Sequence, residues 1–363
     1  MISNVEAECF RLPLKESLVD AAHGEHHFFE LVLCHVRTSK GFEGTGYTYT
    51  GGKGGRAIAE FLRTDVAQIA LGEPANEISA IWSKLQTGLH YVGRGGLLSF
   101  AIAALDIGLW DAAAKQHGKS IASFLTGGKQ VGSVKTYAGF IDLHLDGDSL
   151  SQLAESALSK GFIAVKTKVG RDVMAEDVSR VGLLRSVIGA SCDLMVDANF
   201  ALDIDRSIKF SRAIEEFDIA WFEEPISPDD FEGYGKIAKA TNIPLAMGEN
   251  LHIVEEFERA IQYSKLTYLQ PDASNVGGIT GWLKVAQMAR DAKLTVCTHG
   301  MHELHVSLLA ALEDPGCLEF HSFPIDEFAM HRLELKDGKA VVPDRPGIGV
   351  EFDHGLLKPH KIS

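Results

Sequence analysis

Three short apolar runs of the sequence each end in a carboxylate. The runs are LMVDANF, AWFEEP and PLAMGEN, which carry Asp197, Glu223 and Glu249. Three carboxylates at one place repel one another and take up protons unless a cation lies between them. Ligands that are all oxygen suit Mg²⁺, whereas Zn²⁺ favours nitrogen or sulfur. If the fold brings these residues together, they predict a magnesium site.

Groups that can carry protons end the neighbouring runs. AVKTKVG contains Lys166 and Lys168, which share one face of a strand because they are two residues apart. Each lysine lowers the proton affinity of the other and a metal adds to this effect, so one lysine could act as a base near neutral pH. Asp272 ends LTYLQPD and can fix the tautomer of His299, which ends LTVCTH, and raise its basicity.

The stretch CTHGMHELH places His299, His302 and His305 three residues apart, a spacing that would suit a zinc site on one helix. We predict otherwise, because His299 ends a strand-like run and Gly300 interrupts any helix. The stretch also lacks the HExxH pattern. We therefore expect one acid/base at His299 and a packed helix histidine at His305. Whether His302 reaches the site stays open.

The chain from about Val134 onward alternates eight apolar runs with amphipathic segments such as DGDSLSQLAESALSKG and AEDVSRVGLLRSVIG. This alternation predicts a (β/α)₈ barrel, whose active site lies at the carboxyl ends of its strands. Seven successive runs end in ionisable groups, which is hard to explain as solvated loop starts. Asp197 and Asn199 lie two residues apart and can point together into the barrel mouth.

The first part of the chain mixes strand and helix signals, which predicts an α+β domain. We expect a strand at FFELVLCHVRTSKG, helices at GRAIAEFLRTDVAQIALG and GGLLSFAIAALDIGLWDAAAKQHGK, and loops at AAHGEHH and GTGYTYTGGKGGR. The tail LELKDGKAVVPDRPGIGVEFD has the look of the same domain. We predict a capping domain over 1–128, a barrel over 129–328 and a segment over 329–363 that returns to the cap.

Composition narrows the class of protein. The 363 residues carry a formal charge of −14, which argues against a nucleic-acid partner. It does not argue against a small anionic substrate, because a metal or a lysine pair can reverse the local field. Five cysteines without a CxxC pair indicate reduced thiols in a cytoplasmic protein. We find no signal-peptide core and no apolar run of about 18 residues, so we expect no membrane span.

The motifs together resemble the mandelate racemase subgroup of the enolase superfamily, over nearly the whole chain. They are the KTK, DAN, FEEP and GEN motifs, the aspartate of QPDASNVGG, His299, and AALDIGLWDAAAKQHGKSIASFLTGG. The resemblance implies a modified (β/α)₈-type TIM barrel with an α+β cap formed by both ends of the chain. It also implies Mg²⁺ on Asp197, Glu223 and Glu249.

The resemblance further implies roles for the residues around the metal. Lys168 would be one acid/base and the Asp272–His299 pair the other. Lys166 would contact the carboxylate of the substrate, as would Glu319, either protonated or through the metal-polarised anion. Asn199 would lie near the substrate. Members of the family often form even-numbered assemblies, so a homo-oligomer is the implied expectation.

These residues suit removal of the proton α to a carboxylate, because the resulting enediolate needs Mg²⁺ and positive groups to hold it. Three outcomes remain open, namely racemisation or epimerisation, loss of a β-hydroxyl, and cycloisomerisation. The cap carries many donors that suit a polyhydroxylated acid better than an aryl group, and GFEGTGYTYTGGKGG resembles the cap loops of aldarate and aldonate dehydratases. These donors are His23, His26, His27, Tyr47, Tyr49, Lys53 and Arg56.

We therefore expect a magnesium-dependent lyase that dehydrates an aldonic or aldaric acid to a 2-keto-3-deoxy acid. The alternative is a racemase, epimerase or cycloisomerase that acts through the same enediolate. A barrel that binds a sugar acid without turnover is disfavoured, because neither a ligand nor a base is missing.

Overall fold

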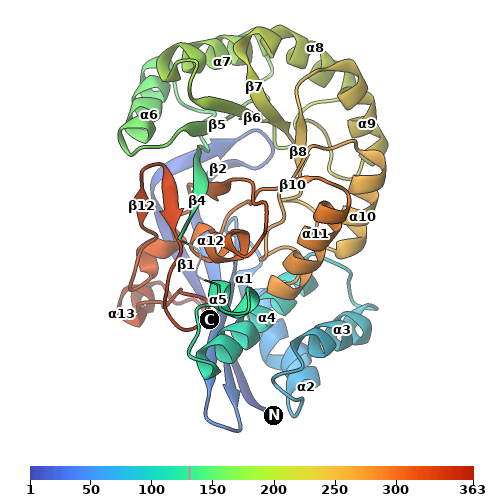
Figure 1. Cartoon of the computed structure of the whole chain (residues 1–363), viewed down its shortest axis with the longest axis vertical. Helices are drawn as coiled ribbons and strands as arrows, with labels where there is room; N and C mark the ends of the chain where they lie inside the picture. Colours follow the sequence, from blue (N-terminus) through green and yellow to red (C-terminus); the bar gives the residue numbers. More distant parts are fainter. Residues whose placement is uncertain (130–131) are drawn as a thin grey trace.

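Eight parallel strands, β4 to β11, form a closed barrel in the computed structural model, which describes residues 1–129 and 132–363. β4 to β10 pair in chain order and β11 pairs with β4. Backbone hydrogen bonds from Gly316 to Val296 and from Thr298 to Cys317 join the last two strands and close the barrel. Helices α6 to α12 follow the first seven strands and surround the barrel (Figure 1). The predicted modified (β/α)₈ barrel is therefore confirmed. In the described chain, β11 is followed by a short 3₁₀ turn and not by an eighth barrel helix.

The barrel strands are β4 (Ser133–Gly139), β5 (Ala164–Lys168), β6 (Asp193–Asp197), β7 (Ile219–Glu223), β8 (Leu245–Met247), β9 (Tyr268–Leu269), β10 (Thr295–Val296) and β11 (Leu318–Phe320). The barrel helices are α6 (Gly147–Ser159), α7 (Met174–Ile188), α8 (Ile204–Ile214), which is extended by the 3₁₀ turn η2 (Glu215–Phe217), α9 (Phe231–Ala240), α10 (Val254–Tyr263), α11 (Ile279–Asp291) and α12 (His302–Ala310).

The inside of the barrel is apolar below its mouth. Met195 and Trp221 belong to a buried cluster with Tyr137, Ala164, Ala246 and Cys297. Met195 lies two residues before Asp197, and Trp221 two residues before Glu223, so each apolar side chain shares the inward face of its strand with a carboxylate. The strand period therefore fills the barrel with apolar side chains and presents the carboxylates at its open end.

The cap contains an antiparallel sheet, β1 (Ile2–Asp20), β2 (Gly24–Thr38) and β3 (Glu43–Thr50). Its helical segments are α1 (Gly55–Phe61), the π-helix η1 (Leu62–Val66), α2 (Ala67–Ala70), α3 (Ile78–Leu89), α4 (Leu97–Gln116) and α5 (Ile121–Leu125). The helices expected at GRAIAEFLRTDVAQIALG and at GGLLSFAIAALDIGLWDAAAKQHGK are confirmed.

Two segments expected to be loops are largely strands. GTGYTYT lies in β3, and His26 and His27 of AAHGEHH lie in β2. The glycines of β3 mark a close approach to α4, because a Cβ on Gly44 or Gly46 would lie 2.0 Å from a backbone oxygen of that helix. Their missing side chains let the sheet lie directly on α4, so they do not signal a turn.

The β1–β2 hairpin brings the cap to the barrel mouth. Its strands, blue in Figure 1, run from the cap up to the barrel strands. Near the turn, the amide of Val19 donates to the Ile141 carbonyl at 3.3 Å, and the amide of Leu143 donates to the Val19 carbonyl at 3.0 Å. The turn is thereby fixed to the loop that follows β4.

The C-terminal segment contacts both parts of the protein. Its elements are the 3₁₀ turn η3 (Ile325–Phe328), β12 (Leu335–Lys336), β13 (Lys339–Val341), α13 (His354–Leu357) and η4 (Lys358–His360). β13 pairs with barrel strand β4 before the chain reaches the cap, where the amide of Ile362 donates to the Cys9 carbonyl at 2.8 Å. The limits at 128 and 328 remain predictions, and residues 130 and 131, near the first limit, lie outside the described residues.

Helix α4 links the cap to the barrel. By length and composition alone it could cross a membrane, but 78% of the 18-residue window that meets this test is buried inside the protein. Asp106 on α4 accepts hydrogen bonds from the amide and the hydroxyl of Thr280, at 2.9 and 2.6 Å, in the first turn of α11. Gly278 makes room for this contact, because a Cβ there would lie 2.5 Å from the carboxylate.

Replacing Asp106 with Ala is expected to lower the free energy of unfolding by about 1–3 kcal/mol, because it leaves a buried amide without an acceptor. Denaturant unfolding of Asp106→Ala should show this loss. The exposed Asp344→Ala is the matched control. Equal stabilities for the two variants would contradict the proposed link between α4 and α11.

Candidate active site

The three predicted metal ligands meet at the barrel mouth. Asp197, Glu223 and Glu249 each offer a carboxylate oxygen within 4.8 Å of the others, and all three are buried. Trp221 and Gln270 donate to Oε2 of Glu223 at 3.0 and 2.6 Å. These bonds leave the other oxygen of Glu223 facing the cluster.

This donor set fits a hard divalent cation. Oε2 of Glu249 is buried and makes no hydrogen bond to the described residues, although Nε2 of His299 lies 3.1 Å away as an ion-pair partner. Burial raises the pKa of Glu223 to about 8, with Lys166 opposing the shift. Carboxylates that burial drives toward protonation gain most from a cation, and their oxygens are the ligands that Mg²⁺ prefers.

The two lysines lie against these carboxylates. Nζ of Lys166 is 2.5 Å from Glu223 and 3.0 Å from Glu319, and Nζ of Lys168 is 2.5 Å from Asp197. Burial disfavours the charged form of each lysine, but the carboxylates outweigh it and hold both pKa values above their usual range. The lysine pair by itself therefore does not lower either pKa, because each ammonium has a carboxylate in direct contact. The expectation that the pair and a bound metal together give a base near neutral pH stays a prediction.

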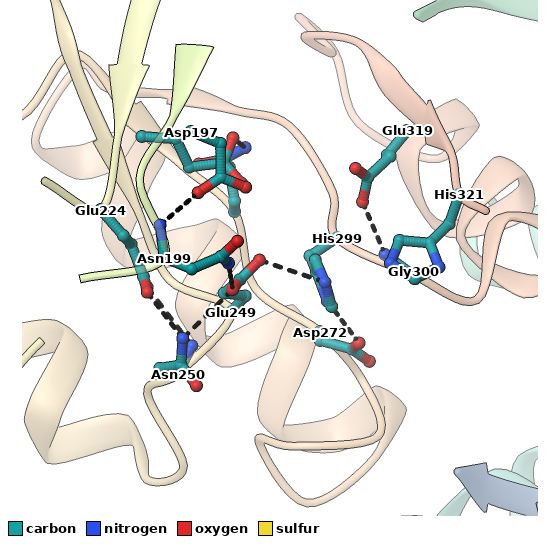
Figure 2. A network of polar contacts seen from close by, with 12 residues as sticks. Asp197, Asn199, Glu224, Glu249, Asn250, Asp272, His299, Gly300, Glu319 and His321 are labelled. Carbon is teal, nitrogen blue, oxygen red and sulfur yellow. Dashed lines mark hydrogen bonds and ion pairs between the residues drawn. The ribbon is translucent and has the colours of Figure 1, made fainter. Parts of the chain in front are cut away.

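His299 and Asp272 form the predicted pair. Nδ1 of His299 lies 3.0 Å from Oδ2 of Asp272, and its Nε2 faces Glu249 (Figure 2). Burial lowers the pKa of His299, but Glu249 and Asp272 outweigh burial and raise it to about 10. The pair therefore lies at the Glu249 end of the carboxylate cluster, whereas Lys168 lies at the Asp197 end. Their acid/base roles remain predictions.

The cap completes this pair. Tyr49, on β3, donates to Oδ2 of Asp272 at 2.9 Å, and the amide of Ser274 donates to Oδ1 at 2.7 Å. Oδ1 of Asp272 is thus held by the backbone, and Oδ2 contacts both Tyr49 and Nδ1 of His299. Tyr49 and Asp272 are 223 residues apart in the chain, so the pattern of the sequence did not show this contact.

Glu319 and Asn199 also lie in the cluster. Glu319 accepts from the amide of Gly300 at 3.0 Å and pairs with Lys166. Burial raises the pKa of Glu319, but Lys166 outweighs burial and holds it below its usual value. Of the two forms that we expected for its contact with a substrate carboxylate, this lowered pKa favours the anion over the protonated form, and the contact itself stays a prediction. Asn199 donates to Glu249 at 3.0 Å, and its buried Oδ1 has no partner among the described residues.

The histidines that follow His299 do not form a zinc site with it. β10 ends at Val296, Gly300 has φ +58°, and α12 begins at His302, as the break at Gly300 predicts. His302 is buried, stacks on Phe320 with ring centroids 4.4 Å apart, and does not line the cleft. His305 is packed as expected, and Nε2 of its ring accepts from the amide of Ala273 at 3.0 Å.

A cleft of about 550 Å³ opens over the cluster, between barrel and cap. The predicted donors that line it are His23, His26, Tyr49 and Lys53. The other three predicted donors do not line the cleft. Tyr47 is buried and donates to Glu303, while His27 and Arg56 are exposed on other surfaces.

Asp20 and His321 are among the cleft residues that the sequence analysis missed. Asp20 lies at the end of β1 and contacts both His23 and His26. His321 lines the cleft beside His299, with ring centroids 4.9 Å apart (Figure 2). It lies two residues after Glu319, so the strand period that identified Asn199 beside Asp197 could have identified it too.

Comparisons with known proteins agree with this geometry. Residues 7–126 match the family described as mandelate racemase / muconate lactonizing enzyme, N-terminal domain, and residues 149–356 match that described as enolase C-terminal domain-like. The chain is 39% identical over 357 residues to a 3,6-anhydro-alpha-L-galactonate cycloisomerase of Streptomyces coelicolor. This match covers 98% of each chain. It is 34% identical over 322 residues to an L-talarate/galactarate dehydratase of Salmonella typhimurium, covering 88% of this chain and 79% of the other.

Solved structures are similar as well. A racemase from Streptomyces coelicolor A3(2) with bound magnesium superimposes with a TM-score of 0.96 at 38% identity, over 100% of both chains. An L-talarate dehydratase from Polaromonas sp. JS666, complexed with Mg and L-glucarate, gives a TM-score of 0.92 at 33% identity, over 100% of this chain and 97% of the other.

Proposed function

Since this chain belongs to the mandelate racemase subgroup of the enolase superfamily, we propose that it removes the proton α to the carboxylate of a sugar acid and expels the oxygen from the β carbon. The observation that carries the proposal is the buried carboxylate cluster with Lys168 at one end and His299 at the other. Such a site can hold an enediolate and move protons on either side of it.

Asp197, Glu223 and Glu249 would hold Mg²⁺. When bound, the ion neutralises the negative charge that develops on the carboxylate oxygens of the substrate. Lys166 is the cation that the chain itself offers to that carboxylate. Glu319, as an anion, is better suited to holding Lys166 or to accepting a hydrogen bond from a substrate hydroxyl.

The reaction needs two proton transfers, and we assign one to each end of the carboxylate cluster. We assign removal of the α proton to Lys168, which lines the cleft and must first give up its own proton to solvent there. Asp272 and Glu249 favour the imidazolium form of His299, so His299 is suited to protonate the departing oxygen. The α proton thus goes to Lys168, the C–O bond breaks, and the oxygen leaves with the proton of His299.

Dehydration and ring opening are the same elimination at this site. In dehydration the oxygen on the β carbon is a hydroxyl, whereas in a 3,6-anhydro sugar acid it belongs to the ring and stays attached to the product. The cycloisomerase relative covers 98% of the chain, which makes an anhydro sugar acid the first substrate to test. Dehydration of an aldonic or aldaric acid, the lyase reaction that we expected from the sequence, remains part of the proposal.

Incubating the enzyme and Mg²⁺ with aldonic, aldaric and anhydro sugar acids tests this proposal. We expect one class to give a 2-keto-3-deoxy acid, detected as a new carbonyl. If every acid were returned unchanged, the proposed elimination would be refuted.

Epimerisation is the second candidate, because two groups that carry protons lie at opposite ends of the cluster. In that case the same incubation would return the acid with inverted configuration at the α carbon and no keto product.

Replacing Tyr49 with Phe is expected to lower kcat by about 10–100-fold, the usual effect of removing a group that orients a catalytic pair. The change removes the hydrogen bond to Asp272 and keeps the ring. Steady-state kinetics should show the loss in kcat more than in KM. Tyr91→Phe, at a side chain that is 93% exposed, is the matched control. Equal kcat values for the two variants would show that the cap does not orient Asp272.

We also propose a cytoplasmic homo-oligomer. All five cysteines are free and four of them are buried, which suits a reducing compartment. Light scattering on the purified protein tests the assembly, and a monomer at micromolar concentration would refute it.

A further inference from the structure

Of the cleft histidines that the proposed proton transfers leave unused, His321 is the one whose ring packs against that of His299. It follows β11, is 7% exposed and lines the cleft beside His299. One of its ring nitrogens lies within 4.8 Å of a nitrogen of His299 and an oxygen of Glu319. It therefore borders the space in which the substrate would react.

The surrounding backbone fixes the tautomer of this ring. The amide of Phe323 donates to Nδ1 of His321 at 3.1 Å, so in the neutral ring the proton is on Nε2. Nε2 takes part in no hydrogen bond or ion pair among residues 1–129 and 132–363. Burial lowers the pKa of His321 well below its usual value, with Glu319 opposing the shift, so the ring stays neutral. The result is an oriented N–H donor without a partner.

The ring is also held rigidly. It packs edge-to-face against Phe323, with centroids 4.9 Å apart, and Phe323 stacks on Phe29 of the cap at 5.5 Å. The amide of His321 donates to Nδ1 of His302 at 3.3 Å. A donor held in this way presents its N–H at one position, which is what recognition of a single substrate atom requires.

We propose that His321 donates a hydrogen bond from Nε2 to the oxygen on the β carbon of the sugar acid and so selects substrates that carry one. The inference rests on the proposed function. A neutral imidazole is too weak an acid to give up this proton, so His321 polarises the oxygen while His299 supplies the proton. The β oxygen is the acceptor because His321 adjoins His299, which must reach the same oxygen.

The test measures exchange of the α proton with solvent for two substrates, a sugar acid that the enzyme accepts and its analogue without the β oxygen. We expect the wild type to prefer the first, and His321→Phe to reduce this preference on the order of 10²-fold, because a site with an unpaired donor discriminates strongly against an analogue that lacks the acceptor. His321→Gln can place an amide N–H near the same point and should recover most of the preference. Thermal unfolding shows whether each variant is folded, and the Gln variant serves if the Phe variant is not.

An unchanged preference in folded His321→Phe would overturn the inference, even if exchange of both acids slowed equally, since His321 would then act only by positioning His299. A folded Gln variant that loses the preference as fully as the Phe variant would also overturn it. These results leave the proposed function standing. No exchange by wild-type enzyme with any sugar acid overturns the proposed function and this inference together.

Discussion

Treatment with EDTA is expected to lower kcat by about 10³-fold, and added Mg²⁺ is expected to restore it. The size of this loss follows from the charge of the enediolate, because a Lewis acid stabilises the transition state by several kcal/mol. A 10³-fold loss in kcat corresponds to about 4 kcal/mol. In the proposed mechanism Lys166 would still lie close to the substrate carboxylate without the metal, but it carries a single positive charge that already pairs with Glu223 and Glu319. The chain alone therefore cannot replace the cation.

A binding measurement tests the same site without relying on activity. Calorimetric titration should detect Mg²⁺ binding to the wild type and to Glu232→Gln, which alters an exposed carboxylate. Glu223→Gln should bind much more weakly, since it removes one of three charged ligands while keeping the shape of the side chain. Full activity in EDTA, or equal Mg²⁺ binding by the two variants, would rule out the carboxylate cluster as the metal site.

Lys168→Ala and His299→Asn are each expected to lower product formation by about 10²–10⁴-fold, the usual contribution of general acid–base catalysis. The two variants should differ in a second reaction. Without Lys168 the α proton should no longer exchange with solvent. Without His299 exchange should continue, because the enediolate still forms and returns to substrate when the β oxygen cannot leave.

Lys236→Ala and His331→Asn, both at exposed positions, are the controls for these variants. Loss of exchange in His299→Asn with exchange retained in Lys168→Ala would reverse the assignment of the two groups. Losses below about 10-fold in both variants would mean that neither residue transfers a proton in the reaction.

The barrel and its carboxylates could be predicted because both depend on local spacing. A strand that buries Met195 or Trp221 must turn the residue two positions later to the same face, so Asp197 and Glu223 are determined by the run that precedes them. The break at Gly300 separates His299 from α12 by equally local rules.

What could not be predicted depends on contacts between distant segments. Gly44 and Gly46 indicated a loop because the helix against which they pack is remote in sequence. The lysine pKa values depend on carboxylates from other strands at 2.5 Å, and the spacing of KTK does not encode them. Tyr49 reaches Asp272 only because the cap lies over the barrel.

The central claim is that the reaction begins with loss of the α proton. Its most direct test is NMR of a sugar acid deuterated at the α carbon, turned over by wild-type enzyme with Mg²⁺ in ordinary water. We predict that the deuterium is released to solvent and that kcat/KM falls relative to the unlabelled acid. Deuterium retained on the carbon skeleton of the product would contradict it.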